Sequence, residues 1–143
     1  MKFIIVLCLA VFSVSAETYN DKYDDTDTTE ILQNCRMLVP YMKCMLGTGK
    51  CTSAAQEMKD NTDEAIKTKC EKCTEKQKQK IKEVVNNLAK CQPTFWKKIT
   101  DIHDADGSLR KENKSDYEDL ISGEVDCTQF KECDINTGRP VGE

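Results

Sequence analysis

The sequence predicts an all-α protein, built as a compact bundle of about six short amphipathic helices. Three observations support this fold class. Apolar residues recur at three- and four-residue steps from about residue 28 to residue 121, which is the period of a helix with one buried face. No segment alternates apolar and polar residues as a half-buried strand does. Gly, Pro and helix-capping residues divide the periodic region into short stretches.

The first two predicted helices span residues 28–34 and 37–46. The first carries Ile31 and Leu32 on one face and follows a capping Asp or Thr. In the second, apolar residues again share a face. Pro40 lacks the N–H that an interior helix bond needs, so we expect it in the first turn of this helix.

The third and fourth predicted helices begin at capping boxes, in which a Ser or Thr is followed three residues later by Gln. Ser53 and Thr74 are the two caps. The third helix runs to about Thr68, and the fourth ends before Pro93. The fourth has the clearest apolar stripe in the chain, made of Ile81, Val84, Val85 and Leu88.

Pro93 also begins a fifth predicted helix, which extends to Ile102. The sequence Asp-Ala-Asp-Gly at 104–107 predicts a turn, and a weaker last helix covers 108–121. Residues 123–143 contain three of the six Gly and one of the three Pro, so we expect an irregular C-terminal tail.

The N-terminus predicts a secreted protein. Lys2 precedes an apolar run over 3–14, and Val-Ser-Ala at 14–16 supplies the small residues that signal peptidase recognises. The run is too short to cross a bilayer core of about 30 Å. We therefore expect residues 1–16 to be a signal peptide, followed by a helical domain over 17–122.

Composition and charge exclude several functions. The chain carries 21 Lys and Arg against 25 Asp and Glu, so it lacks the basic surface that nucleic acid or an anionic membrane attracts. It has a single His, His103, and no nucleophile pattern accompanies it. Cys70-x-x-Cys73 has neither the second pair that zinc needs nor the strand–helix context of a redox motif. We expect no enzyme activity, no cofactor and no metal.

The cysteine count indicates disulfides. Removing the signal peptide leaves eight of the nine cysteines, an even number in an oxidising compartment. Spacing alone does not choose among the many pairings. A bridge from Cys44 to Cys51, or from Cys70 to Cys73, would clamp the corner between two consecutive helices.

The spacing C-x6-C-x18-C-x2-C, at Cys44, Cys51, Cys70 and Cys73, resembles that of the arthropod chemosensory protein family, also called OS-D. The resemblance covers roughly residues 19–121. Further matching segments are Asp21-Lys-Tyr-Asp24, Glu30-Ile-Leu32, Thr74-Glu-Lys-Gln-Lys78, Pro93, Trp96 and Asp104-Ala-Asp-Gly107.

The resemblance implies a six-helix domain with small-loop disulfides Cys44–Cys51 and Cys70–Cys73, and an internal channel for long apolar molecules. It places Tyr23 and Tyr41 at the mouth or wall of that channel and Trp96 as an aromatic residue in the fifth helix. Four cysteines depart from the family pattern. One pairing we consider for them is Cys35 with Cys91 and Cys127 with Cys133, and other pairings stay open.

We therefore predict a secreted, monomeric carrier of small hydrophobic molecules, such as fatty acids, long-chain alcohols or esters and semiochemicals, which it does not transform. Apolar stripes alone indicate only a folded core, but four of the five Met lie in the second and third helices, and flexible Met side chains adapt to varied guests. The predicted ligand-binding residues are Tyr23, Ile31, Leu38, Tyr41, Met42, Met45, Ile66, Val84, Val85 and Trp96.

Two other functions are considered. One is a secreted protein-interaction factor, with a developmental, immune or inhibitory role, that uses the extra cysteines and the tail. The other is a small hydrolase built on His103.

Overall fold

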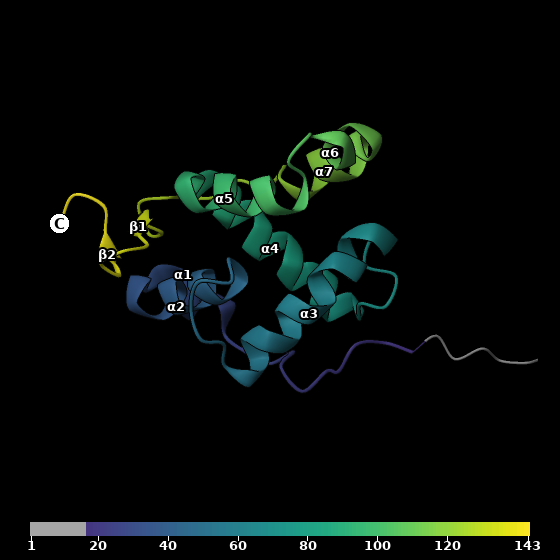
Figure 1. Ribbon diagram of the computed structural model, residues 1–143, viewed down its shortest axis with the longest axis horizontal. Coiled ribbons are helices and arrows are strands. Elements are labelled where there is room, and N and C mark those ends of the chain that lie inside the picture. The colour runs from purple at the N-terminus through teal and green to yellow at the C-terminus, as the bar shows by residue number, and fades with distance from the viewer. Residues whose placement is uncertain (1–16) are drawn as a thin grey trace, which may run out of the picture.

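The computed structural model describes residues 17–143, and the signal peptide predicted over 1–16 lies outside the described residues. The predicted all-α class is confirmed (Figure 1). Residues 17–143 form seven helices and one ladder of two very short strands. None of the helices in this described part is long and apolar enough to cross a membrane.

The first two helices are α1, Thr28–Gln33, and α2, Cys35–Met45. α2 begins two residues earlier than expected because the Asn34 side chain accepts the N–H of Arg36 at 3.1 Å and caps the helix. The expected position of Pro40 in the first turn is therefore wrong. It lies in the middle of α2, where its missing N–H leaves one helical hydrogen bond unmade.

The next two helices are α3, Ser53–Thr68, and α4, Glu75–Cys91. The cap of α3 is Thr52 rather than Ser53, since the Thr52 hydroxyl accepts the N–H of Ala55 at 3.2 Å. The capping box of α4 is present as predicted. Thr74 and Gln77 each bond the other's backbone N–H through their side chains.

Helix α5, Pro93–His103, begins at Pro93 as predicted, and the turn after it is formed with Gly107 at a φ of 71°. The single helix expected over 108–121 is wrong. It is divided into α6, Ser108–Glu112, and α7, Lys114–Leu120. The division falls at Asn113, whose backbone leaves the helical region and whose side-chain amide donates to the Leu109 carbonyl at 3.0 Å.

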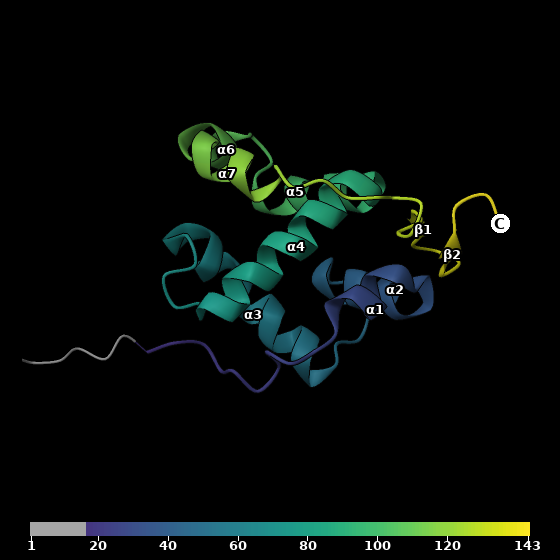
Figure 2. The ribbon, with the colours of Figure 1, turned by 180° about the vertical axis from the view of Figure 1, so that it is seen from behind.

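The C-terminal segment contains an antiparallel ladder of β1, Cys133–Asp134, and β2, Arg139–Pro140. The connecting turn places Gly138 at a φ of 68°, and the Gly138 N–H donates to the Asp134 carbonyl at 2.9 Å. Strands of two residues show no alternation, so the sequence pattern did not reveal them. Figure 2 shows the chain after α7 running along α5 toward β1, beside α2.

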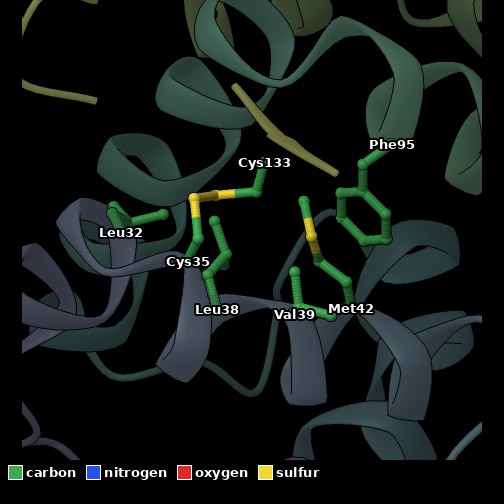
Figure 3. Packing of buried hydrophobic residues seen from close by; sticks show 7 residues of the cluster. All are labelled: Leu32, Cys35, Leu38, Val39, Met42, Phe95 and Cys133. Atoms are coloured by element: carbon green, nitrogen blue, oxygen red, sulfur yellow. A yellow bond between two sulfur atoms is a disulfide. The ribbon is translucent and has the colours of Figure 1, made fainter. Parts of the chain in front are cut away.

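The buried core lies between α1, α2 and α5, with one cysteine of the C-terminal segment (Figure 3). Met42 of α2 lies alongside the ring of Phe95, and Cys133 reaches the same cluster through its bond to Cys35. α4 contributes Val84 and Leu88, which are partly buried against this cluster. The full cluster consists of Leu32, Cys35, Leu38, Val39, Met42, Phe95 and Cys133.

Candidate functional site

Half of the ten predicted ligand-binding residues lie in or against the core. Leu38 and Met42 are core residues, with 5% and 1% of their surface exposed. Ile31, Met45 and Val84 are partly buried and pack against the same cluster. These five side chains therefore stabilise the packing between helices, and any ligand near them meets a surface that is already largely covered.

The other five predicted residues lie outside this core cluster. Tyr23, Tyr41, Val85 and Trp96 are half-buried, and Ile66 is 38% exposed. They belong to the N-terminal arm and to α2, α4, α5 and α3 respectively. The structure thus separates the predicted set into a packed half and an accessible half.

Apolar side chains on three consecutive helices remain exposed. α3 packs against α2 and buries Ala55 there, but Met58 farther along α3 is 46% exposed. Ile81 of α4 is 36% exposed, and Ile102 of α5 is 55% exposed. Helices α3, α4 and α5 therefore each keep an apolar side chain exposed, although Phe95 of α5 lies in the core and Val84 of α4 packs against it.

Two shallow hollows in residues 17–143 are lined mainly by polar residues and are open to solvent. One, of about 590 Å³, is formed by Lys90 at the end of α4 with residues 124–126. The other, of about 580 Å³, lies between the α1–α2 junction and the C-terminal segment. None of the ten predicted ligand-binding residues lines either one, so neither hollow corresponds to the apolar channel that the resemblance implies.

The N-terminal arm is bound along the start of α4. The Gln77 side chain donates to the Asn20 carbonyl at 3.0 Å and to the Asp24 carboxylate at 2.8 Å. The Thr74 hydroxyl donates to the same carboxylate at 3.1 Å. Tyr23, one residue before Asp24, is held half-buried by these bonds. The arm is therefore a fixed part of the surface next to α4.

An electrostatic cluster holds the beginning of this arm. Glu64 accepts from Lys72 at 2.6 Å and from the Tyr19 hydroxyl at 3.3 Å. The hydrogen bond from Lys72 lowers the pKa of Glu64. Burial, together with the charge of Glu64, raises the pKa of Tyr19. This cluster attaches the arm to α3.

The structure contains the Cys44–Cys51 and Cys70–Cys73 bridges that the resemblance implies, each between consecutive helices.

The pairing considered for the other four cysteines is wrong. Cys35 bonds Cys133 and Cys91 bonds Cys127, with Cα–Cα distances of 5.4 and 5.3 Å. The physical reason is that the C-terminal segment runs from the end of α4 to the start of α2. The cysteine at each of these helix ends therefore meets a cysteine of the C-terminal segment, and not the cysteine of the other helix.

Sequence reasoning missed Gln92, which is fully buried between α4 and α5. Its side-chain amide donates to the Lys131 carbonyl at 2.9 Å and accepts the Cys133 N–H at 2.8 Å. Nothing in the local sequence distinguishes this Gln from an exposed one. Asn87, 2% exposed on α4, was also missed, although its three-residue step from Val84 places a polar residue on the apolar face.

His103 and the following turn have structural roles. His103 Nδ1 lies 2.9 Å from Asp63 Oδ1. All eight cysteines in residues 17–143 are in disulfides, so none of them is a free thiol beside His103. The Asp104 carboxylate accepts the Leu109 N–H at 2.9 Å and Arg110 Nε at 2.6 Å. Burial raises the pKa of Asp104, but these hydrogen bonds outweigh it and hold the pKa below its ordinary value. Asp104 thus fixes the start of α6.

Comparison with known proteins gives a consistent result. The sequence profile described as the insect pheromone-binding family A10/OS-D matches residues 19–111. Allergen Tha p 1 of Thaumetopoea pityocampa is 37% identical over 111 residues, 78% of this chain and 88% of the allergen. Ejaculatory bulb-specific protein 3 of Drosophila melanogaster is 39% identical over 108 residues, 74% of this chain and 86% of that protein.

A solved structure of a chemosensory protein in complex with bromo-dodecanol is also similar. It superimposes with a TM-score of 0.63 at 37% identity, covering 68% of this chain and 98% of that chain.

Proposed function

Because the chain belongs to the insect pheromone-binding family A10/OS-D, a family of chemosensory and odorant-binding carriers, we propose that it is a secreted carrier of small hydrophobic molecules. Its ligands are fatty acids, long-chain alcohols or esters and semiochemicals, which it transports without transforming them. Residues 1–16 direct export, and residues 17–122 form the carrier domain. The similar protein that holds bromo-dodecanol supports a chain-like apolar ligand.

The observation that supports this proposal most strongly is the exposure of apolar side chains on α3, α4 and α5. Ile66, Ile81 and Ile102 are each more than a third exposed, although each lies on a helix that otherwise has one apolar face. Water contact with such surface is unfavourable. A ligand that covers these faces recovers that free energy.

The expected driving force is the hydrophobic effect. Covering a methylene group stabilises the complex by about 0.8 kcal/mol before ordering costs. A twelve-carbon chain offers enough methylenes to exceed those costs, whereas a four-carbon chain does not. Since few polar groups are required, we expect selection by chain length more than by head group.

The test is displacement of a fluorescent apolar probe, N-phenyl-1-naphthylamine, from oxidised protein of residues 17–143. We expect dodecanol, dodecanoic acid and dodecyl acetate to displace the probe and butanol to fail. Replacing an exposed apolar residue of α3, Ile66→Ser, should weaken dodecanol competition by about threefold or more.

The matched control is Val141→Ser, which removes an apolar side chain that is 59% exposed but lies in the C-terminal segment. It should leave competition unchanged. Failure of every twelve-carbon compound to displace the probe would refute the carrier function, and equal effects of the two substitutions would refute the placement of the ligand.

The second candidate function is a secreted protein-interaction factor. The observation that favours it is the C-terminal segment, which lies beyond residues 19–111 of the family match and is attached by two disulfides. Replacing Gln129 and Lys131, two exposed residues of this segment, by Ala distinguishes the candidates while both disulfides stay intact. If the variant no longer binds a protein partner but still binds the fluorescent probe, the interaction function is supported. If the variant loses probe binding, the interaction function is not supported.

A further inference from the structure

The polar hollow beside α2 has walls from two distant parts of the chain. One wall is the α1–α2 junction, residues 33–36. The other is the C-terminal segment, at residues 128–129, 131, 138–140 and 143. The Cys35–Cys133 disulfide joins the two walls. The volume of about 580 Å³ is in the range of small-molecule sites. Since a covalent bond and the β1–β2 ladder hold the walls, the hollow exists before any ligand binds.

The charges lining this hollow are mainly positive. Arg36, Lys131 and Arg139 line it, and Glu143 is the only acid that does so. Glu143 pairs with Lys131 at 2.6 Å. Within residues 17–143, neither arginine forms an ion pair with a carboxylate. The hollow therefore presents two guanidinium groups that form no ion pair within residues 17–143.

The acidic residues nearest in the chain are engaged elsewhere. Asp134 stands opposite Arg139 in the β ladder, but its carboxylate accepts the Asn136 N–H at 2.8 Å and the Thr137 hydroxyl at 3.1 Å. Glu132 accepts the Thr94 N–H at 3.2 Å. These carboxylates stabilise the turn and the attachment to α5, and neither of them forms an ion pair with Arg36 or Arg139.

The direction of α2 adds to the positive potential. Its N-terminus lies at this hollow, and its first turn contains Arg36 and no acidic residue. A helix N-terminus carries a partial positive charge, so a cation there is unfavourable unless an anion lies close by. The backbone N–H of Arg36 is satisfied by Asn34, and its side chain forms no ion pair within residues 17–143.

We propose that this hollow binds the oxyanion group of a small organic ligand, a carboxylate or a phosphate. The planar guanidinium groups of Arg36 and Arg139 bind it with paired N–H donors, as arginine binds such groups elsewhere. The source of the oxyanion is either a free small anion or the head group of a long-chain fatty acid. The site is distinct from the exposed apolar faces of α3, α4 and α5, so binding of a free anion does not depend on the carrier function, whereas binding of a fatty-acid head group rests on it.

The test is an NMR titration of oxidised, ¹⁵N-labelled protein of residues 17–143 at constant ionic strength. The probes are inorganic phosphate, sodium acetate and sodium dodecanoate below its micelle concentration, with sodium chloride as the reference. We expect saturable amide shifts in 33–36 and 128–143. Tighter binding of dodecanoate than of acetate at these amides identifies the fatty-acid head group as the source, and equal binding identifies free anions.

Two double variants make the test specific. Arg36→Gln with Arg139→Gln should weaken the binding of each oxyanion by about tenfold or more. The control, Lys67→Gln with Lys98→Gln, removes the same charge from exposed residues of α3 and α5 and should leave the affinity unchanged. All four residues are exposed, and the amide spectrum reports whether each variant is folded. The absence of saturable shifts with every oxyanion, or an equal loss in both variants, would overturn the proposal. Probe displacement by dodecanol reports on the carrier function separately.

Discussion

At the scale of single residues, Gln92 is one of the side chains that join the C-terminal segment to the helices without a covalent bond. It is fully buried, and both ends of its amide are paired with backbone groups of residues 131 and 133. If such a buried side-chain amide is removed, its partners lose their hydrogen bonds and water cannot reach them to replace those bonds. The fold is then destabilised.

We expect Gln92→Ala to lower the free energy of unfolding by about 1–3 kcal/mol, because it leaves the buried Cys133 N–H without a partner and removes the donor to the Lys131 carbonyl. Urea denaturation of the oxidised protein measures this loss. Gln79→Ala is the control, since Gln79 is exposed on α4 and should change stability by less than about 0.5 kcal/mol. Similar losses in both variants would show that the pairing of Gln92 has no special weight.

Asp104 gives a prediction about pH. Its folded-state pKa lies below the ordinary value of 3.8, so its contribution to stability is complete above that value and is lost as pH falls through the lower, folded-state pKa. We expect the stability of the native protein to fall more steeply than that of Asp104→Asn between about pH 5 and pH 2. Denaturation midpoints across this range measure the difference. Parallel pH profiles would contradict the role assigned to Asp104.

At the scale of elements, helix boundaries followed from the sequence wherever local chemistry determined them. Thr74 with Gln77 and Pro93 mark helix starts by hydrogen bonds and ring geometry that lie within a few residues. The prediction was less accurate where two neighbouring residues could serve as the cap, as with Thr52 and Ser53. It was wrong at Asn113, where a side-chain bond to the previous turn divides one helix into two.

The capping box of α4 is expected to contribute measurably to stability. Thr74→Ala removes the acceptor of the Gln77 N–H and the donor to Asp24, which also fixes the N-terminal arm. We expect a loss of about 0.5–2 kcal/mol in the free energy of unfolding, measured by thermal or urea denaturation. Ser115→Ala, in the exposed first turn of α7, is the control and should be nearly neutral. A neutral Thr74→Ala would exclude a stabilising role of this cap.

At the scale of the whole molecule, contacts between distant segments could not be predicted from the sequence. The amphipathic stripes indicated which residues of each helix are apolar. They did not indicate that Leu38 and Met42 would be packed while Ile66 would stay exposed, because that depends on which helices meet. The bonds of Cys35 and Cys91 to the C-terminal segment likewise depend on the path of a segment without periodicity.

The long-range bridge should stabilise the fold more than a short-range one. Cys35–Cys133 spans 98 residues and Cys44–Cys51 spans 7, so the chain-entropy estimate is about 4.7 kcal/mol for the first and about 2.4 kcal/mol for the second. We expect replacement of Cys35 and Cys133 together by Ala to lower the free energy of unfolding more than replacement of Cys44 and Cys51. Denaturation of the two double variants compares them, and an equal or reversed order would refute this ranking.

The carrier function that we propose requires an apolar ligand to cover the exposed faces of α3, α4 and α5. Methyl NMR of the oxidised protein during titration with dodecanol tests it most directly. The predicted result is saturable shifts at Ile66, Ile81, Val85 and Ile102, with none at Val141, which is 59% exposed. Shifts confined to Val141 and other surface methyls, or no saturable shift up to the solubility limit of dodecanol, would contradict it.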